Sequence, residues 1–145
     1  MAGVERYFSR AFIDAFVVAL RRDVKFQSAT RKFKNAIELR VLDMPDGEDL
    51  RVRYHVDRGM VTADVTTGRT PSAAIREAPF DKGALLIRAT ALYATWTKLD
   101  RGDISVVGAL RSPDFRVEGG VLSAAARAAA LTAMNAVAQK MPKTY

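Results

Sequence analysis

The chain has 145 residues, of which 49% are apolar, and a formal net charge of +7 with an isoelectric point near 10.1. This length fits a single domain, residues 1–145, whose core needs no disulfide or metal for stability. The absence of cysteine excludes thiol catalysis, Cys-ligated zinc and disulfides. With one histidine, no set of nucleophile, base and orienting group can be assembled, so an enzyme is the class that we expect least.

Apolar residues recur at steps of three and four near the N-terminus, which predicts an amphipathic helix over about residues 3–22. Its most apolar part, 11–20, is too short to cross a bilayer as a helix. It contains Asp14 and is followed, not preceded, by Arg21 and Arg22, unlike a signal peptide. We therefore expect a cytoplasmic protein.

A basic segment begins at the end of this helix. It contains six cations and a single carboxylate, Asp23. The cations are Arg21, Arg22, Lys25, Arg31, Lys32 and Lys34. A concentration of one charge attracts anionic lipid, nucleic acid or acidic proteins. Two interpretations stay open here, a solvated linker and a specific contact with an anionic surface such as a membrane.

Strict alternation of apolar and polar residues begins near residue 37. It covers 37–41, 50–56 and 61–65, with turn residues between the runs. This pattern predicts three antiparallel strands whose second face meets water. His55 falls on that wet face, so we interpret it as a surface residue without a catalytic or metal-binding role.

No binding motif of fixed spacing stands out. Four carboxylates surround the first turn of the meander: Asp43, Asp46, Glu48 and Asp49. Their spacing does not match a calcium-binding loop, and we interpret the cluster as a solvated hairpin tip. The glycines of the second half form neither a dinucleotide-binding fingerprint nor a phosphate-binding loop.

The second half predicts shorter elements. In chain order they are a helix over 72–77, a strand over 85–89, a middle helix capped by Thr90 and running to Leu99, and a strand around 115–117. Nine alanines between Val121 and Ala138 predict a C-terminal helix over 121–139. Together these elements define an α+β domain.

The C-terminal helix carries small side chains on one face. At about 100° per residue, one arc collects Leu122, Ala125, Ala126, Ala129, Ala130, Ala133, Ala136 and Val137. Such a face either packs very close to the sheet or leaves volume for a ligand, and both alternatives stay open. Leu131 and Met134 lie off the arc and, if exposed, would mark a partner surface.

The segment 95–104, Thr-Trp-Thr-Lys-Leu-Asp-Arg-Gly-Asp-Ile, resembles the short helix and turn of sterol-carrier-protein type 2 domains. Ala109 followed by Phe115-Arg116-Val117-Glu118-Gly119 is similar to the next segment of that family. The resemblance covers about residues 1–140. It implies a mostly antiparallel five-stranded sheet covered by the N-terminal helix, the short middle helix and the Ala-rich C-terminal helix. Between them it implies an apolar tunnel for a fatty acyl, acyl-CoA, sterol-like or quinone-like lipid.

The predicted function is therefore binding or transfer of an apolar or amphipathic ligand, without catalysis, metal or cofactor. The residues expected to line the tunnel are Phe12, Phe16, Leu92, Trp96, Leu99, Ile104, Val107, Phe115, Val117, Ala126, Ala129 and Ala133. The alternative is a scaffold module with a collapsed cavity, which docks an acidic partner or anionic membrane through its basic surface. Specific nucleic-acid binding ranks lower, because no base-reading motif accompanies the charge.

Overall fold

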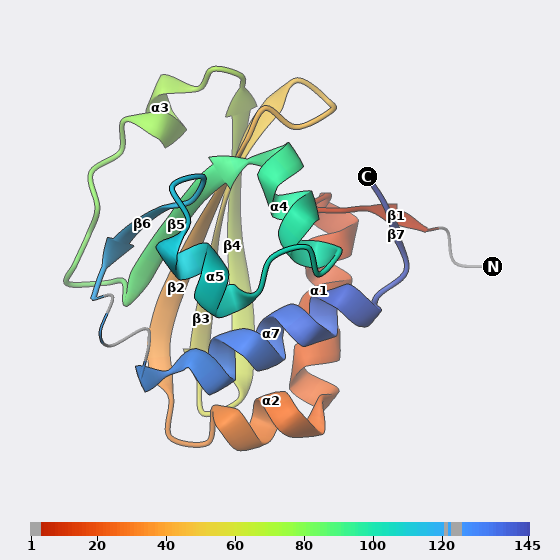
Figure 1. The fold of residues 1–145 in the computed structure, drawn as a ribbon, viewed down its shortest axis with the longest axis vertical. Helices are drawn as coiled ribbons and strands as arrows, with labels where there is room; N and C mark the ends of the chain where they lie inside the picture. The colour runs from red at the N-terminus through yellow and green to blue at the C-terminus, as the bar shows by residue number, and fades with distance from the viewer. Residues whose placement is uncertain (1–3, 121, 123–125) are drawn as a thin grey trace.

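A computed structural model describes residues 4–120, 122 and 126–145, which form two main layers (Figure 1). One layer is a five-stranded sheet in the order β4-β3-β2-β5-β6. Its strands are β2 (Lys34–Leu42), β3 (Glu48–Asp57), β4 (Met60–Arg69), β5 (Ile87–Leu92) and β6 (Arg116–Gly119). Only the central pair, β2 and β5, is parallel. The predicted α+β fold and mostly antiparallel five-stranded sheet are confirmed.

The second layer consists of helices packed on one face of this sheet (Figure 1). Its members are α1 (Arg10–Arg22), α2 (Val24–Ala29), α4 (Tyr93–Asp100), α5 (Val106–Arg111) and α7 (Ala128–Lys140). A further short helix, α3 (Ala73–Arg76), lies on the opposite face, where its last turn accepts hydrogen bonds from Arg40. None of the described helices combines the length and apolar character that crossing a bilayer requires.

The first helix starts later than its periodicity predicts. The chain turns at Phe8, which has a positive φ of 63°, and Ser9 caps α1 by accepting a hydrogen bond from the Phe12 backbone N–H. Before this turn lies a short strand, β1 (Glu5–Arg6), paired in parallel with β7 (Lys143–Thr144). The apolar residues Tyr7 and Phe8 therefore pack from a turn instead of a helix.

The basic segment is a folded corner, so its interpretation as a solvated linker was wrong. Asp23 ends α1 and caps α2, where its carboxylate accepts from the Phe26 backbone N–H at 2.9 Å. Phe26 is fully buried, which anchors α2. Gln27 then donates to the Gly59 carbonyl at 2.9 Å and ties the corner to the turn between β3 and β4.

Thr90 does not cap the middle helix as predicted. It lies within β5, where its hydroxyl accepts a hydrogen bond from Arg40 Nε at 2.7 Å. The helix α4 starts after Leu92, which has no side-chain capping bond. Helix α5 is an element that the alternation did not predict; Ser105 caps it through the Gly108 backbone N–H.

The face of the sheet predicted to be wet is covered at its centre. Across five strands, the register aligns Asp64, Arg53, Glu38, Arg88 and Glu118 in one row of alternating charge. Glu38 contacts the guanidinium groups of Arg53 at 3.0 Å and Arg88 at 3.5 Å, and Arg88 contacts Glu118 at 3.0 Å. Glu38 and Arg88 are buried, so the alternating polar residues there form an ion-pair network instead of a solvated surface.

Candidate functional site

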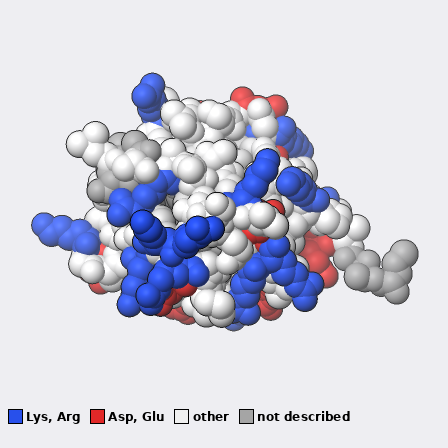
Figure 2. All heavy atoms as spheres, turned by 90° about the horizontal axis from the view of Figure 1, so that it is seen from below, with Lys and Arg blue, Asp and Glu red and all other residues white. Residues whose placement is uncertain are grey.

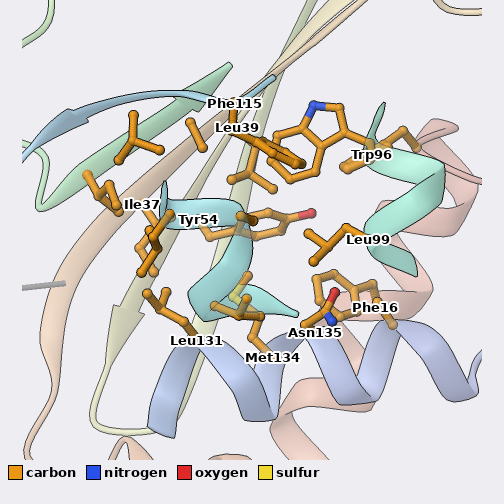
Figure 3. Close-up of a pocket in the computed structure, with 18 of the residues that line it drawn as sticks. Phe16, Ile37, Leu39, Tyr54, Trp96, Leu99, Phe115, Leu131, Met134 and Asn135 are labelled. Carbon is orange, nitrogen blue, oxygen red and sulfur yellow. The ribbon is translucent and has the colours of Figure 1, made fainter. Parts of the chain in front are cut away.

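An apolar cavity of about 120 Å³ lies between the sheet and the helices (Figure 3). Its sheet-side lining is Ile37, Leu39, Tyr54, Ile87, Ala89 and Val117. Its lining on the other side is Tyr7, Phe8, Phe12, Phe16, Trp96, Leu99, Val106, Ala109, Leu110, Phe115, Leu131, Met134, Asn135 and Ala138. Protein interiors contain few voids larger than a water molecule, so this volume is too large for an ordinary packing defect.

The period of the strands explains the sheet-side lining. Ile37 and Leu39 alternate with polar residues on β2, and parallel pairing sets Ile87 and Ala89 of β5 beside them on the same face. Ala89 has only a methyl group, so the sheet leaves volume in front of it. The cavity therefore lies over the central parallel pair.

Aromatic rings form much of the remaining lining. The Trp96 ring meets the Phe115 ring edge-on, with centroids 4.9 Å apart, and its indole N–H donates to the Arg40 carbonyl at 3.1 Å. The Phe16 ring meets the Tyr54 ring edge-on at 5.7 Å. Because its only polar atom is bonded to the backbone of β2, Trp96 presents an apolar surface to the cavity.

Three polar side chains also reach the lining, namely Tyr7, Tyr54 and Asn135. Burial raises the pKa of both tyrosine hydroxyls, and the neighbouring Asp100 carboxylate raises that of Tyr7 further. No Lys, Arg, Asp, Glu or His belongs to the described lining. The site can therefore hold an apolar group and hydrogen-bond to it, but it offers no charge and no nucleophile–base pair.

Of the twelve residues predicted to line a tunnel, the cavity brings together Phe12, Phe16, Trp96, Leu99, Phe115 and Val117. Ile104 packs against the core without reaching the cavity. Leu92 and Val107 are exposed, at 48% and 45%, because each sits where its helix or strand faces away from the core.

The predicted orientation of the C-terminal helix was wrong in part: Ala130 and Val137 of the predicted arc are buried, but neither lines the cavity. Ala126 and Ala129 are exposed and Ala133 is partly buried, while Ala125 lies outside the described residues. The cavity is lined instead by Leu131, Met134, Asn135 and Ala138 of α7. Larger side chains bury more apolar area than alanine, and this decides which face of a helix turns inward. The alternative that Leu131 and Met134 mark an exposed partner surface is excluded as well.

The sequence contained a signal for part of the remaining lining. Ile37, Leu39 and Tyr54 lie at the apolar positions of strands that the alternation predicted. Tyr7 and Phe8 were assigned to a helix stripe, and Asn135 carried no signal because one amide on an apolar helix has no characteristic spacing.

The six cations of the basic segment are all exposed. Figure 2, which views the molecule from below, shows Lys and Arg side chains projecting from this end. Arg21 also donates to the Val61 carbonyl at 2.7 Å and 3.1 Å, which fixes its position. Val24 of this corner and Met60, the first residue of β4, expose apolar side chains, at 81% and 60%. Gln27 joins the corner to Gly59, which precedes Met60.

The described residues contain no group of three or more acidic or histidine side chains placed to bind a metal ion. His55 is exposed on β3, away from the cavity lining.

Comparison with known proteins gives a clear result for structures and none for sequences. No family model matches the chain, and no curated protein does. A crystal structure of sterol carrier protein 2 superposes with a TM-score of 0.74 and 18% identity, over 94% of this chain and 99% of that one. The chain has the sterol carrier protein 2 fold.

Two further structures share the sterol carrier protein 2 fold with this chain. A conserved hypothetical protein of Thermus thermophilus gives a TM-score of 0.72 and 17% identity, over 99% of this chain and 94% of its own. The apo form of sterol carrier protein 2 from Yarrowia lipolytica gives 0.52 and 18%, over 95% and 97%. Identity at this level shows a common fold, and the resemblance noted in the sequence agrees with it.

Proposed function

We propose that the chain binds and carries an apolar or amphipathic small molecule in the cavity between its sheet and helices. The observation that carries this proposal is an apolar space of about 120 Å³ in a fold whose structural neighbours are sterol carrier proteins. Burial of ligand surface at about 25 cal/mol per Å² supplies the driving force, and no covalent step is needed.

The volume limits what fits without rearrangement. An engineered apolar cavity of about 150 Å³ holds one benzene molecule. The present cavity is slightly smaller, so it takes one ring or a short alkyl segment. A whole sterol or long acyl chain requires α4, α5 and α7 to move outward from the sheet, since these helices line the cavity opposite the strands.

Two measurements test the proposal. Native mass spectrometry of the protein as purified searches for a co-purified lipid, and a fluorescent fatty-acyl probe measures saturable binding and its displacement by unlabelled lipid. We expect saturable binding with competition. Calorimetry without saturable binding of acyl, sterol and quinone ligands would favour the scaffold alternative.

The scaffold alternative draws on one specific observation. The corner of α1 and α2 exposes its cations beside the apolar side chains of Val24 and Met60, a combination suited to an anionic lipid surface. We propose this corner as an accessory membrane contact of a carrier. Liposome binding without any ligand binding in the cavity would make it the main function.

A further inference from the structure

The Tyr54 side chain is almost fully enclosed and belongs to the cavity lining. Tyr54 is 1% exposed, and its hydroxyl makes no hydrogen bond to any described residue. In Figure 3 the Tyr54 ring crosses the middle of the cavity and its hydroxyl points toward the side where Leu99 lies. Enclosed hydroxyls are nearly always hydrogen-bonded, so a hydroxyl directed into a cavity is placed to bond a polar group that enters it.

A second polar group faces the same space from the opposite layer. Asn135 lies on α7 among cavity-lining residues, and its side-chain amide forms no hydrogen bond with the described part of the chain. Figure 3 shows this amide beside Phe16 and Leu99, on the side toward which the Tyr54 hydroxyl points. An amide both donates and accepts, as does a phenol hydroxyl.

The charge of the lining restricts what these two groups can hold. An ionised carboxylate or phosphate placed in an apolar cavity without a counter-charge loses its hydration and gains no compensation. No cationic side chain belongs to the described lining. The group that enters must therefore be neutral and must carry an oxygen or nitrogen that exchanges hydrogen bonds.

We propose that Tyr54 and Asn135 determine ligand specificity by hydrogen-bonding one neutral hydroxyl or carbonyl oxygen on a ring-sized or short apolar group. This inference rests on the proposed function and narrows its ligand class. A sterol-like hydroxyl and a quinone-like carbonyl satisfy it, whereas the free carboxylate of a fatty acid does not enter this part of the cavity.

The test uses three probes of nearly equal size: toluene, phenol and benzoate. Calorimetry at pH 7 measures their dissociation constants for the wild type, Tyr54→Phe and Asn135→Leu. We expect either substitution to weaken phenol binding about tenfold, the effect of one lost hydrogen bond, while toluene binding changes less than about twofold. Benzoate should bind the wild type at least about a hundredfold more weakly than phenol.

Tyr93→Phe is the matched control. Tyr93 is also buried, at 7% exposure, but it does not line the cavity, so its loss of a hydroxyl should leave both dissociation constants unchanged. Equal losses of phenol and toluene affinity in Tyr54→Phe would overturn the inference while leaving cavity binding intact. Benzoate binding as tight as phenol would overturn it too. If neither toluene nor phenol binds the wild type, the proposed function fails and the inference fails with it.

Discussion

The Arg76 guanidinium donates two hydrogen bonds to the Asp49 carboxylate, from Nε at 2.8 Å and from Nη2 at 3.1 Å. The same carboxylate accepts from the backbone N–H groups of Ser72 and Asp43 at 2.8 Å and 2.9 Å. Asp49 is fully buried and joins α3 to the turn between β2 and β3. Its interpretation as part of a solvated hairpin tip was therefore wrong.

This pair makes the stability depend on pH in a defined direction. Burial alone would raise the pKa of Asp49, but hydrogen bonds from Arg76, Ser72 and Asp43 outweigh it and hold the pKa far below its usual range. A depressed native pKa stabilises the fold above the unfolded value of about 4 and loses this contribution as the pH falls below it. Asp49→Asn should lower the free energy of unfolding by about 2 kcal/mol at pH 7. Urea unfolding at pH 7, 5 and 3 should show the difference from wild type shrinking with acid.

Asp46→Asn is the control for this experiment. Asp46 pairs with Arg6 at 2.9 Å, but its side chain is 44% exposed. Removing an exposed pair should cost less than about 1 kcal/mol. A loss in Asp46→Asn as large as that in Asp49→Asn would contradict the assignment of the pH dependence to the buried carboxylate.

Ala89→Leu should block ligand binding without weakening the fold. The added carbons project from β5 into the cavity, which has room for them, so the urea midpoint of the ligand-free protein should stay level or rise. The dissociation constant of a fluorescent acyl probe should increase at least about tenfold, since the ligand loses contact volume. A fall in the midpoint with affinity preserved would place the ligand elsewhere.

Ala129→Leu tests the corrected orientation of α7. Because Ala129 is exposed, the larger side chain should change neither the midpoint nor the probe affinity, within about 0.5 kcal/mol. A strong loss of affinity in this variant would restore the orientation that the alanine arc predicted.

The corner of α1 and α2 should prefer anionic over neutral liposomes at low salt. Such contacts are screened within about 10 Å at 0.1 M salt, so the preference should decline as salt is added. Lys25→Glu should reduce the fraction of protein that sediments with phosphatidylserine vesicles. Lys82→Glu is the control, because it makes the same charge change at an exposed position outside this corner. It should reduce that fraction less. Equal sedimentation with both vesicle types would argue against a membrane contact.

His55→Ala should leave ligand affinity unchanged and stability within about 0.5 kcal/mol, as for most exposed positions. Probe titration and urea unfolding of the variant measure both quantities. A loss of binding would mean that the exposed face of β3 takes part in function.

The strands of the sheet could be predicted from the sequence because each strand has its own alternation of apolar and polar residues. Alternation at Ile37 and Leu39 and again at Val52 and Tyr54 identifies both the strands and their inner face, and turn residues separate them. The predicted lining that the cavity contains came from three patterns: the stripe of the first helix, the inner face of the middle helix and the alternation of the last strand.

The errors arose where distant segments decide the structure. Glu38 and Arg88 are polar by composition, yet they are buried because α3 and the chain after it cover that face of the sheet. Asp49 is buried because Arg76, far along the chain, reaches it. Which face of α7 turns inward depends on the cavity over β2 and β5, and Met134 lies on the inward face. The residues of α7 alone do not determine this, because other segments form the cavity.

The parallel pairing of β2 with β5 also constrains how the protein folds. In the sequence, β3, β4 and α3 separate Ile37 from Ile87, so closing this pair costs more chain entropy than forming the hairpins of the meander. The meander can assemble from neighbouring contacts, but the lining of the cavity extends from Tyr7 to Ala138 and needs nearly the whole chain. The cavity is therefore complete only once α7 has packed against the other elements that line it.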